Sequence, residues 1–289
     1  MNVTFIFSDY CLHNQIIENY AKVRPQDKIS IVKVPLVIRG KGRRKTAEAI
    51  LPKLPRRFIL GKLVEFISLS LITLTPKLLK KGAVFRRLSS MAKRLNVPFK
   101  IVEDINSPES LEFIRSQTPE IIYSLFHQIV KAPLISIPTV AFVNAHPGLL
   151  PEFKGIQPYL WQLSTGHSNS GATLHLIEDA GVDTGRVLGQ GSYPHPQKIS
   201  VQLNYFLTCK VISSMLPKLT QYFEEQKVIP QPQKIDGEGK SNYYKWPDKD
   251  SIDNLSARGH RLIDLKQLWG ILSGVYDDFS GEETFNLKE

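Results

Sequence analysis

Residues 2–7, Asn-Val-Thr-Phe-Ile-Phe, make a short run of β-branched and aromatic side chains. A second run of this kind, Ile-Ser-Ile-Val-Lys-Val-Pro-Leu-Val-Ile, occupies residues 29–38. Such runs are typical of β-strands. The polar stretch between them carries apolar residues at the spacing of one helix face, namely Leu12, Ile16, Ile17 and Tyr20. The opening of the chain therefore predicts a strand, a helix and a second strand.

The same alternation continues along the chain. Residues 97–102, 121–126 and 140–144 predict further strands, the last ending at His146, and residues 107–117 predict a helix. Alternating strands and helices favour a Rossmann-like α/β fold with a mostly parallel sheet, whose ligands bind at the carboxyl ends of the strands. The turn after the first strand lacks the glycines that a dinucleotide pyrophosphate requires, which argues against a dinucleotide cofactor.

The chain is expected to divide near Pro230. Residues 200–227 predict one long amphipathic helix, which closes a catalytic domain of residues 1–228. The composition turns polar after Pro230-Gln231-Pro232, which predicts a small C-terminal appendage, residues 229–289.

Basic residues are concentrated in one segment. The chain carries 37 Lys and Arg against 27 Asp and Glu, a net charge of +10. Residues 39–100 hold 17 Lys and Arg and two Glu, a net +15, so the other 227 residues sum to −5. We therefore expect a basic insert, residues 39–96, in a mildly acidic catalytic domain. Its charge favours an anionic partner: a membrane surface, the phosphates of a substrate or, less favoured, a nucleic acid.

Within this insert, residues 58–79 include 13 apolar residues in 22, interrupted by Lys62, Glu65, Pro76 and Lys77. This stretch is too polar for a membrane span, which needs about 20 nearly uncharged apolar residues. Two interpretations stay open. We favour an ordinary helix packed on the sheet. The alternative is an amphipathic helix lying in a membrane interface, with its basic flanks attracted to anionic head groups.

Cys11 and Cys209 are the only cysteines, too few for a disulfide framework or a zinc site. The first residues lack the basic start and the apolar core of a signal peptide. We therefore expect a metal-free protein of the cytoplasm, with membrane association through the insert as the open alternative. Nothing in the sequence indicates the oligomeric state.

Residues 142–158 begin as an apolar strand and then become rich in Pro and Gly. Asn144 and His146 are two residues apart, so both side chains project to the same side at the end of the strand. An amide donor beside an imidazole suits stabilisation of a developing oxyanion together with proton transfer. Asp183, in a later loop, supplies a carboxylate that could orient the imidazole. Taken singly, Asn144 and Asp183 are also common turn residues.

These residues resemble the 10-formyltetrahydrofolate-dependent formyltransferases, the family of the methionyl-tRNA, glycinamide-ribonucleotide and nucleotide-sugar formyltransferases. The matching motifs lie in order over about forty residues: Asn144-x-His146, Leu149-Leu150-Pro151, Lys154-Gly155, Gln157-Pro158, Gly171-Ala172-Thr173-Leu174-His175 and Val182-Asp183-Thr184-Gly185. The resemblance extends more loosely from the first strand to residue 227, and it fades in the basic insert and the tail. Two positions depart from the family's pattern: Gly148 stands where Ser is usual, and Lys154 where Arg is common.

The resemblance implies that Asn144, His146 and Asp183 are the catalytic residues. A neutral amine would attack the formyl carbon, and Asn144 and His146 would stabilise the resulting oxyanion. Asp183 would hold His146 and help to remove the proton of the amine. Protonation of the folate nitrogen would then release tetrahydrofolate. This chemistry requires neither a metal nor a covalent enzyme intermediate.

The resemblance also implies where the co-substrate 10-formyltetrahydrofolate binds. Its pterin is expected beside the end of the strand before the Asn-x-His strand, at Phe126, His127, Gln128, Ile129 and Val130. The other wall is expected in the loop before Asp183, at Ala180, Gly181 and Val182.

Several other polar and aromatic residues have weaker signals. His167, His175 and His195 have no second ligand at a metal-binding spacing, so they are interpreted as structural or solvated. Asp9, after the first strand, is a weak candidate for the acceptor site. The aromatic residues of the tail are expected to pack it onto the domain or to stack on a base or sugar, namely Tyr243, Tyr244 and Trp246.

The acceptor is expected to be a primary amine of a small molecule, such as an amino sugar on a nucleotide carrier. Methionyl-tRNA formyltransferases carry a larger C-terminal domain than residues 229–289 provide, but such an enzyme stays an alternative. A second alternative is a formyltetrahydrofolate deformylase, which uses water as acceptor and usually has a regulatory domain ahead of the first strand. A third is a non-catalytic relative bound to a membrane or nucleic acid through residues 39–100.

Overall fold

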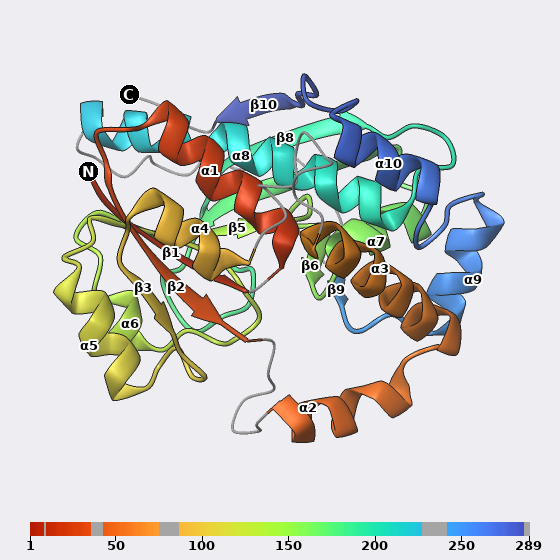
Figure 1. Ribbon diagram of the computed structural model, residues 1–289, viewed down its shortest axis with the longest axis horizontal. Helices are drawn as coiled ribbons and strands as arrows, with labels where there is room; N and C mark the ends of the chain where they lie inside the picture. Colours follow the sequence, from red (N-terminus) through yellow and green to blue (C-terminus); the bar gives the residue numbers. More distant parts are fainter. Residues whose placement is uncertain (9, 36–42, 75–86, 227–241, 286–289) are drawn as a thin grey trace.

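The computed structural model describes residues 1–8, 10–35, 43–74, 87–226 and 242–285. Helices cover both faces of a central sheet (Figure 1). In chain order the elements are β1 (Asn2–Ser8), η1 (Cys11–His13), α1 (Asn14–Val23), β2 (Lys28–Val34), α2 (Arg43–Ile50), η2 (Leu51–Lys53), α3 (Arg56–Leu74), α4 (Leu88–Leu95), β3 (Phe99–Ile101), α5 (Pro108–Ser116), β4 (Ile121–Leu125), α6 (Ala132–Ile135), β5 (Ala141–His146), β6 (Phe153–Gly155), α7 (Pro158–Ser164), β7 (Asn169–Leu176), β8 (Val187–Pro194), α8 (Val201–Gln226), β9 (Asn242–Tyr244), α9 (Lys249–Ala257), α10 (Leu265–Ser273) and β10 (Glu282–Phe285).

Among the described residues, eight strands form the central sheet in the order β10-β8-β7-β5-β4-β1-β2-β3. Strands β1 to β5 pair in parallel, whereas β7, β8 and β10 extend one edge in antiparallel pairs. The chain runs outward from β1 through β2 to β3 and then returns to the other side of β1 with β4. The strand order therefore reverses between β1 and β4, where sheets of this kind bind ligands. The predicted Rossmann-like, mostly parallel α/β fold is confirmed.

Alternation along the strands explains the two helical layers. Val3, Phe5 and Phe7 of β1 point to one face and pack in a large core with α1, α4, α7 and α8. Ile6 of the same strand points to the opposite face, into a second core beneath α5 and α6. Successive side chains of a strand point to opposite faces, so a strand that is buried on both sides reads as a continuous apolar run.

The structure reproduces most of the elements expected from the sequence. β1, β3, β4, β5, α5 and α8 lie within a few residues of their predicted ranges. β2 ends at Val34, and residues 36–38 of the predicted strand lie outside the described residues. The basic insert connects β2 to β3 and contains α2, α3 and α4. Phe58 and Leu69 of α3 join the main core, and the predicted stretch after residue 74 lies outside the described residues.

The described part of the tail, residues 242–285, is packed into the domain. β9 pairs in parallel with β6, and β10 adds an antiparallel strand beside β8. α9 contacts α7, and α10 contacts α8. Of the three aromatic residues expected to pack, Tyr244 does so, because its ring stacks on Phe153 and on Trp161 with centroids 5.7 and 4.7 Å apart, whereas Tyr243 is exposed.

Candidate active site

The predicted catalytic residues meet at the carboxyl end of β5. Asn144 and His146 lie on this strand between the parallel neighbour β4 and the antiparallel neighbour β7. In the ladder with β7, Asn144 pairs with His175, and His146 pairs with Thr173. This register brings a residue of β7 into the site, and the loop that follows β7 contributes Asp183.

The amide of Asn144 has a defined orientation. The hydroxyl of Ser124 donates to Oδ1 of Asn144 at 3.2 Å, and Nδ2 of Asn144 donates to Nε2 of His175 at 3.0 Å. Nδ1 of His175 lies 3.0 Å from the carbonyl oxygen of Leu176, so Nδ1 carries the hydrogen and Nε2 accepts. Because an amide nitrogen carries two hydrogens, Asn144 can donate a second hydrogen bond to a substrate oxygen.

The imidazole of His146 is buried between two acceptors. Its Nδ1 lies 3.3 Å from Oδ1 of Asp183, and its Nε2 lies 2.6 Å from the carbonyl oxygen of Phe153. A ring whose nitrogens both face oxygen acceptors is satisfied only when both nitrogens carry hydrogens. The ring is therefore held from both sides, by Asp183 at Nδ1 and by the backbone of Phe153 at Nε2.

Asp183 connects the site to the loop after β5. Its backbone φ is 53°, in the left-handed region that Asp adopts more readily than most residues. Its Oδ2 accepts a hydrogen bond of 2.7 Å from the backbone N–H of Gly155, and its Oδ1 faces His146 and, at 3.6 Å, His175. Burial alone would raise the pKa of this carboxyl, but the charge and hydrogen bond of His146, with the contacts of His175 and Gly155, hold it well below its ordinary value.

The short ladder between β6 and β9 supports these contacts. Phe153 and Gly155 of β6, which contact His146 and Asp183 through their backbones, pair with Asn242 and Tyr244 of β9. Gly155 has a φ of +98°, and a Cβ there would lie 2.2 Å from the carbonyl oxygen of Tyr244. Only glycine fits this close approach without displacing the backbone.

The segment predicted to hold the pterin has mixed surroundings. His127 and Ile129 are exposed, and Phe126 is half-buried. The segment follows β4, whose Ser124 pairs with Asn144 of β5, so it begins beside the strand that carries the catalytic candidates. Gln128 instead ties the loop to the backbone of Ile105 and Glu103, and Val130 packs in the second core.

The opposite predicted wall is exposed. Ala180, Gly181 and Val182 all lie on the surface of the loop before Asp183. The N–H of Gly181 donates to Oδ1 of Asp179 at 2.7 Å, which shapes this turn. Exposed backbone and the apolar Val182 next to the carboxylate are suited to the edge and face of a flat heterocycle.

The sequence does not predict the role of His175. Its spacing indicates a structural or solvated residue, but in the structure it contacts Asn144 and faces Asp183. The signal that could have found it is the β5–β7 register, which a single sequence does not reveal. His167 and His195 do have structural surroundings: Nε2 of His195 contacts the carbonyl oxygen of His167, at 2.6 Å, and His167 packs against Phe153.

The two departures from the family's pattern have different surroundings. A Cβ at Gly148 would lie 2.5 Å from Cβ of Pro158 and 3.0 Å from Nε2 of His146, so glycine fits here where a side chain would press on the imidazole. Lys154 lies half-buried on β6, opposite Tyr243 of β9. Asp9 lies outside the described residues.

No group of three His, Cys, Asp or Glu side chains within the described ranges has a geometry that could hold a metal ion.

Comparison with known proteins finds similarity in the region of the chain that carries the candidate catalytic residues. Residues 101–200 match the profile of a family described as Formyl transferase. A methionyl-tRNA formyltransferase of Trichlorobacter lovleyi is 27% identical over 147 residues, which cover 50% of this chain and 46% of the relative. That of Caldanaerobacter subterraneus is 27% identical over 193 residues, which cover 65% and 61%. The chain thus spans about half the length of the curated relatives it matches.

Solved structures share the fold. A phosphoribosylglycinamide formyltransferase from Anaplasma phagocytophilum superimposes with a TM-score of 0.54 at 15% identity, over 81% of this chain and 95% of that one. A sugar N-formyltransferase from Shewanella sp. superimposes with a TM-score of 0.52 at 15% identity, over 89% and 88%. Residues 101–200, which include Asn144, His146 and Asp183, thus match the formyltransferase family in sequence, and the solved structures share the fold. The family predicted from the Asn-x-His and Asp-Thr-Gly motifs is confirmed.

Proposed function

We propose that this protein transfers the formyl group of 10-formyltetrahydrofolate to a primary amine of a small molecule. The observation that carries the proposal is the connected cluster of Asn144, His146, His175 and Asp183 at the end of β5. It combines an oriented amide donor, a buried imidazole and a carboxylate, which are groups suited to acyl transfer to an amine.

Each residue has a role that follows from its contacts. Asn144 donates to the formyl oxygen, and the imidazole of His146 helps to stabilise the negative charge that develops there. Asp183 holds the ring of His146. In the proposed reaction, a bond forms between the amine nitrogen and the formyl carbon, and the bond from that carbon to the folate nitrogen breaks. The proton lost by the amine replaces the formyl group on the folate nitrogen.

The donor would lie between the two predicted walls. His127 and Ile129 are exposed on one segment and Val182 on the other. Apolar side chains and free backbone beside the cluster fit a flat, polar-edged ring system such as a pterin.

We further propose that the acceptor is an amino sugar on a nucleotide carrier. Lys154 and the exposed ring of Tyr243 are paired across the β6–β9 ladder, next to the backbone that holds Asp183. An ammonium and an open aromatic face can bind a phosphate and stack on a base or sugar. The described part of the tail, residues 242–285, packs on the domain and places Tyr243 beside this site.

The proposal also places the reaction in the cytoplasm, because two cysteines are too few for a disulfide framework.

The test is acceptor profiling with 10-formyltetrahydrofolate. The acceptors are amino-sugar nucleotides, glycinamide ribonucleotide, charged initiator tRNA and a reaction without amine, and mass spectrometry detects the formylated product. We expect product with an amino-sugar nucleotide and none from the variant Asn144→Ala. Formylation of charged tRNA alone would show that the acceptor is methionyl-tRNA and not a small molecule. Formate release at the same rate with and without an amine would show that the enzyme is a deformylase and not a transferase.

A further inference from the structure

Helix α3 has charged side chains on its buried face and large apolar side chains on its exposed face. Phe58, Lys62, Glu65 and Leu69 follow one another at three or four residues, so they share one helix face. Phe58, Glu65 and Leu69 are buried, and Lys62 is half-buried. A surface helix of a globular domain normally has the opposite arrangement, with its charged residues in water.

The inward face is anchored by specific contacts. The ammonium of Lys62 donates to Glu65 at 2.8 Å, and the hydroxyl of Tyr10, just after β1, donates to the other carboxylate oxygen of Glu65. Gly61 is packed against Leu262, since a Cβ at Gly61 would lie 2.8 Å from Cδ1 of that leucine. These contacts fix the orientation of α3 on the domain. The opposite face of the helix is therefore exposed in a defined orientation.

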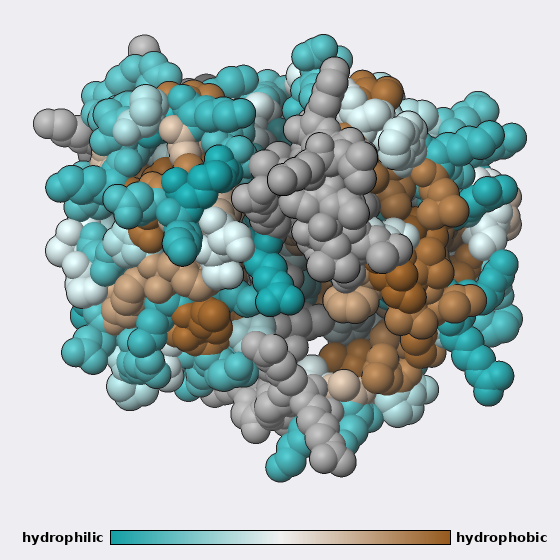
Figure 2. Space-filling model, viewed as in Figure 1, coloured by the Kyte–Doolittle hydropathy of each residue, from teal (hydrophilic) through white to brown (hydrophobic). Residues whose placement is uncertain are grey.

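The outward face is a continuous apolar surface. Four large side chains at helical spacing are between about one half and two thirds exposed: Leu60 at 61%, Leu63 at 51%, Phe66 at 69% and Ile67 at 49%. Figure 2 shows hydrophobic side chains gathered in a band at the position of α3. Single exposed apolar residues are ordinary on a protein surface, but a contiguous group of this kind marks an interaction site.

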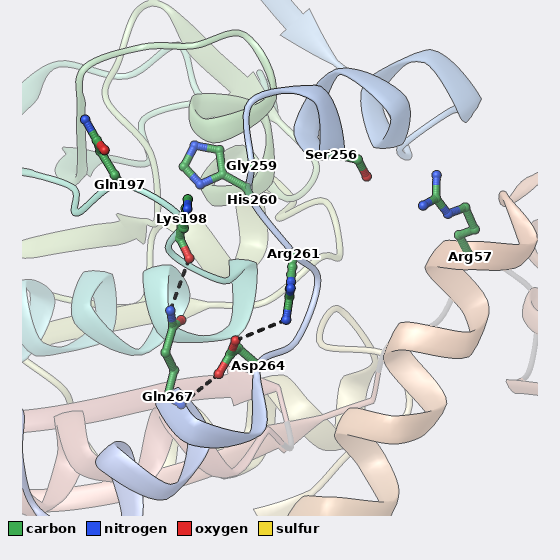
Figure 3. A pocket seen from close by; sticks show the side chains of 9 residues that line it. All are labelled: Arg57, Gln197, Lys198, Ser256, Gly259, His260, Arg261, Asp264 and Gln267. Atoms are coloured by element: carbon green, nitrogen blue, oxygen red, sulfur yellow. Dashed lines mark hydrogen bonds and ion pairs between the residues drawn. The ribbon is translucent and has the colours of Figure 1, made fainter.

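A basic pocket adjoins this face. It is lined by Arg57 of α3 and by Lys198 and Arg261, with Asp264 as the only carboxylate among the lining residues (Figure 3). Arg57 and Arg261 are exposed and form ion pairs with Asp253, at 3.3 Å, and with Asp264, at 3.6 Å. Asp264 also accepts from the backbone of two residues at the start of α10. With Lys198, three cations face these two carboxylates, so the pocket keeps a net positive charge.

The pocket and the apolar face lie on the same side of α3. Leu60 and Val64 follow Arg57 by three and seven residues, which places them beside it along the helix. A ligand that covers the apolar face therefore meets Arg57 at its border. None of the residues that line the pocket belongs to the catalytic cluster, so this surface has a different role.

We propose that α3 docks on an anionic lipid surface, with Leu60, Leu63, Phe66 and Ile67 in the interface and lipid phosphates at Arg57 and Arg261. Two features favour a lipid surface. Residues 39–100, the segment that contains α3, carry a net charge of +15, which attracts this segment to an anionic surface. Apolar residues bordered by Lys and Arg are the composition of helices that lie in a membrane interface. No described helix is long and apolar enough to cross a membrane. The inference does not depend on the reaction proposed above.

The apolar contribution is tested with two pairs of substitutions on exposed residues. Leu63→Gln with Phe66→Gln removes apolar surface from α3, whereas Val23→Gln with Ile101→Gln removes comparable surface from α1 and β3. Each protein is mixed with phosphatidylcholine vesicles containing about 30% phosphatidylglycerol, an anionic content that attracts basic segments. Flotation measures the bound fraction. We expect the α3 pair to weaken binding about tenfold or more and the control pair to leave it unchanged.

The charge contribution has its own matched pair. Arg57→Gln with Arg261→Gln and the control Arg115→Gln with Lys131→Gln change the net charge equally, but the control residues lie on α5 and before α6. Only the first pair should weaken vesicle binding, by about tenfold. Binding of the unaltered protein should also fall between about 0.1 M and 1 M salt.

Three results would overturn the inference. The first is failure of the unaltered protein to float with anionic vesicles. The second is equal weakening by both charge pairs, which would mean nonspecific attraction. The third is a dimer in sedimentation velocity that dissociates on Leu63→Gln with Phe66→Gln, because the face would then bind a second copy. Thermal unfolding of every variant must match the unaltered protein, and the exposure of the altered residues makes this the expected result.

Discussion

Asp183 holds one side of the His146 imidazole, with Oδ1 3.3 Å from Nδ1, while the carbonyl oxygen of Phe153 lies 2.6 Å from the other ring nitrogen. The ring is therefore fixed by a residue of strand β6 and a residue of the loop after β7, about thirty positions apart in sequence. Because both ring nitrogens have partners, His146 is held in place before any substrate binds.

The ion pair gives a pH-dependent stability. The fold holds the pKa of Asp183 below its unfolded value, so the carboxylate stabilises the protein above about pH 4 and this contribution is lost as the pH falls. Asp183→Asn keeps the acceptor for Gly155 and tolerates the same backbone conformation, but it removes the charge. We expect it to lower the free energy of unfolding by about 2 kcal/mol at pH 7.

Urea unfolding at pH 7 and pH 3 measures this effect. The difference between the unaltered protein and Asp183→Asn should shrink at the lower pH. Asp179→Asn changes an exposed carboxylate of the same loop and should have a smaller effect at pH 7. A difference that grows on acidification would contradict the assignment of the ion pair.

His175 is expected to be a positioning residue for Asn144. Replacement by Ala removes the acceptor for Nδ2 of Asn144, so kcat should fall about tenfold while KM for the acceptor stays nearly constant. Loss of Asn144 itself should cost about a hundredfold or more. Steady-state kinetics of His175→Ala and His175→Gln are the measurement. The glutamine retains an acceptor, and the account requires it to recover part of kcat.

Gly155 of β6 contacts both the tail, through Tyr244 of β9, and the site, through Asp183. Gly155→Ala combines an unfavourable φ of +98° with a Cβ 2.2 Å from the carbonyl oxygen of Tyr244, so it should cost about 3 kcal/mol and displace the N–H that binds Asp183. Gly259 is the matched control, because its φ is +81° but a Cβ there meets only Lys198 at 3.5 Å. Gly259→Ala should cost about 1 kcal/mol. Equal costs, measured by chemical unfolding, would refute the close approach at Gly155.

The two thiols should differ in reactivity. Burial raises the pKa of the Cys209 thiol far above its ordinary value, so it stays protonated at pH 8, whereas Cys11 is half-buried. Alkylation of the native protein with iodoacetamide should label Cys11 first, and both cysteines should react in denaturant. Peptide mass spectrometry reads the site of labelling. Preferential labelling of Cys209 in the native protein would mean that α8 opens locally.

Much of the fold follows from local sequence patterns. β1, β4 and β5 are buried on both faces and read as apolar runs, so their positions could be predicted. β6 and β9 could not, because each has three residues and no alternation, and their pairing joins positions about ninety residues apart. The exposed apolar face of α3 was equally hidden, since a sequence shows the spacing of apolar residues but not which side packs.

The candidate site, like the fold, could be predicted only in part from the sequence. The spacing of Asn144 and His146 predicts that they project together, because successive strand residues point to opposite faces. The role of His175 depends on a cross-strand register, and that of Phe153 on a backbone carbonyl oxygen. Neither relation leaves a pattern in one chain, which is why the side chains that hold the site are harder to predict than those that carry the chemistry.

The central claim is that His146, held by Asp183, promotes formyl transfer to an amine. The most direct measurement follows a ¹³C-formyl label from 10-formyltetrahydrofolate to the acceptor found by profiling, for the unaltered protein and for His146→Ala. Circular dichroism and thermal unfolding establish that both are folded. We predict labelled N-formyl product from the unaltered protein and a rate at least about a hundredfold lower from the variant. Transfer at an unchanged rate by folded His146→Ala would contradict the account.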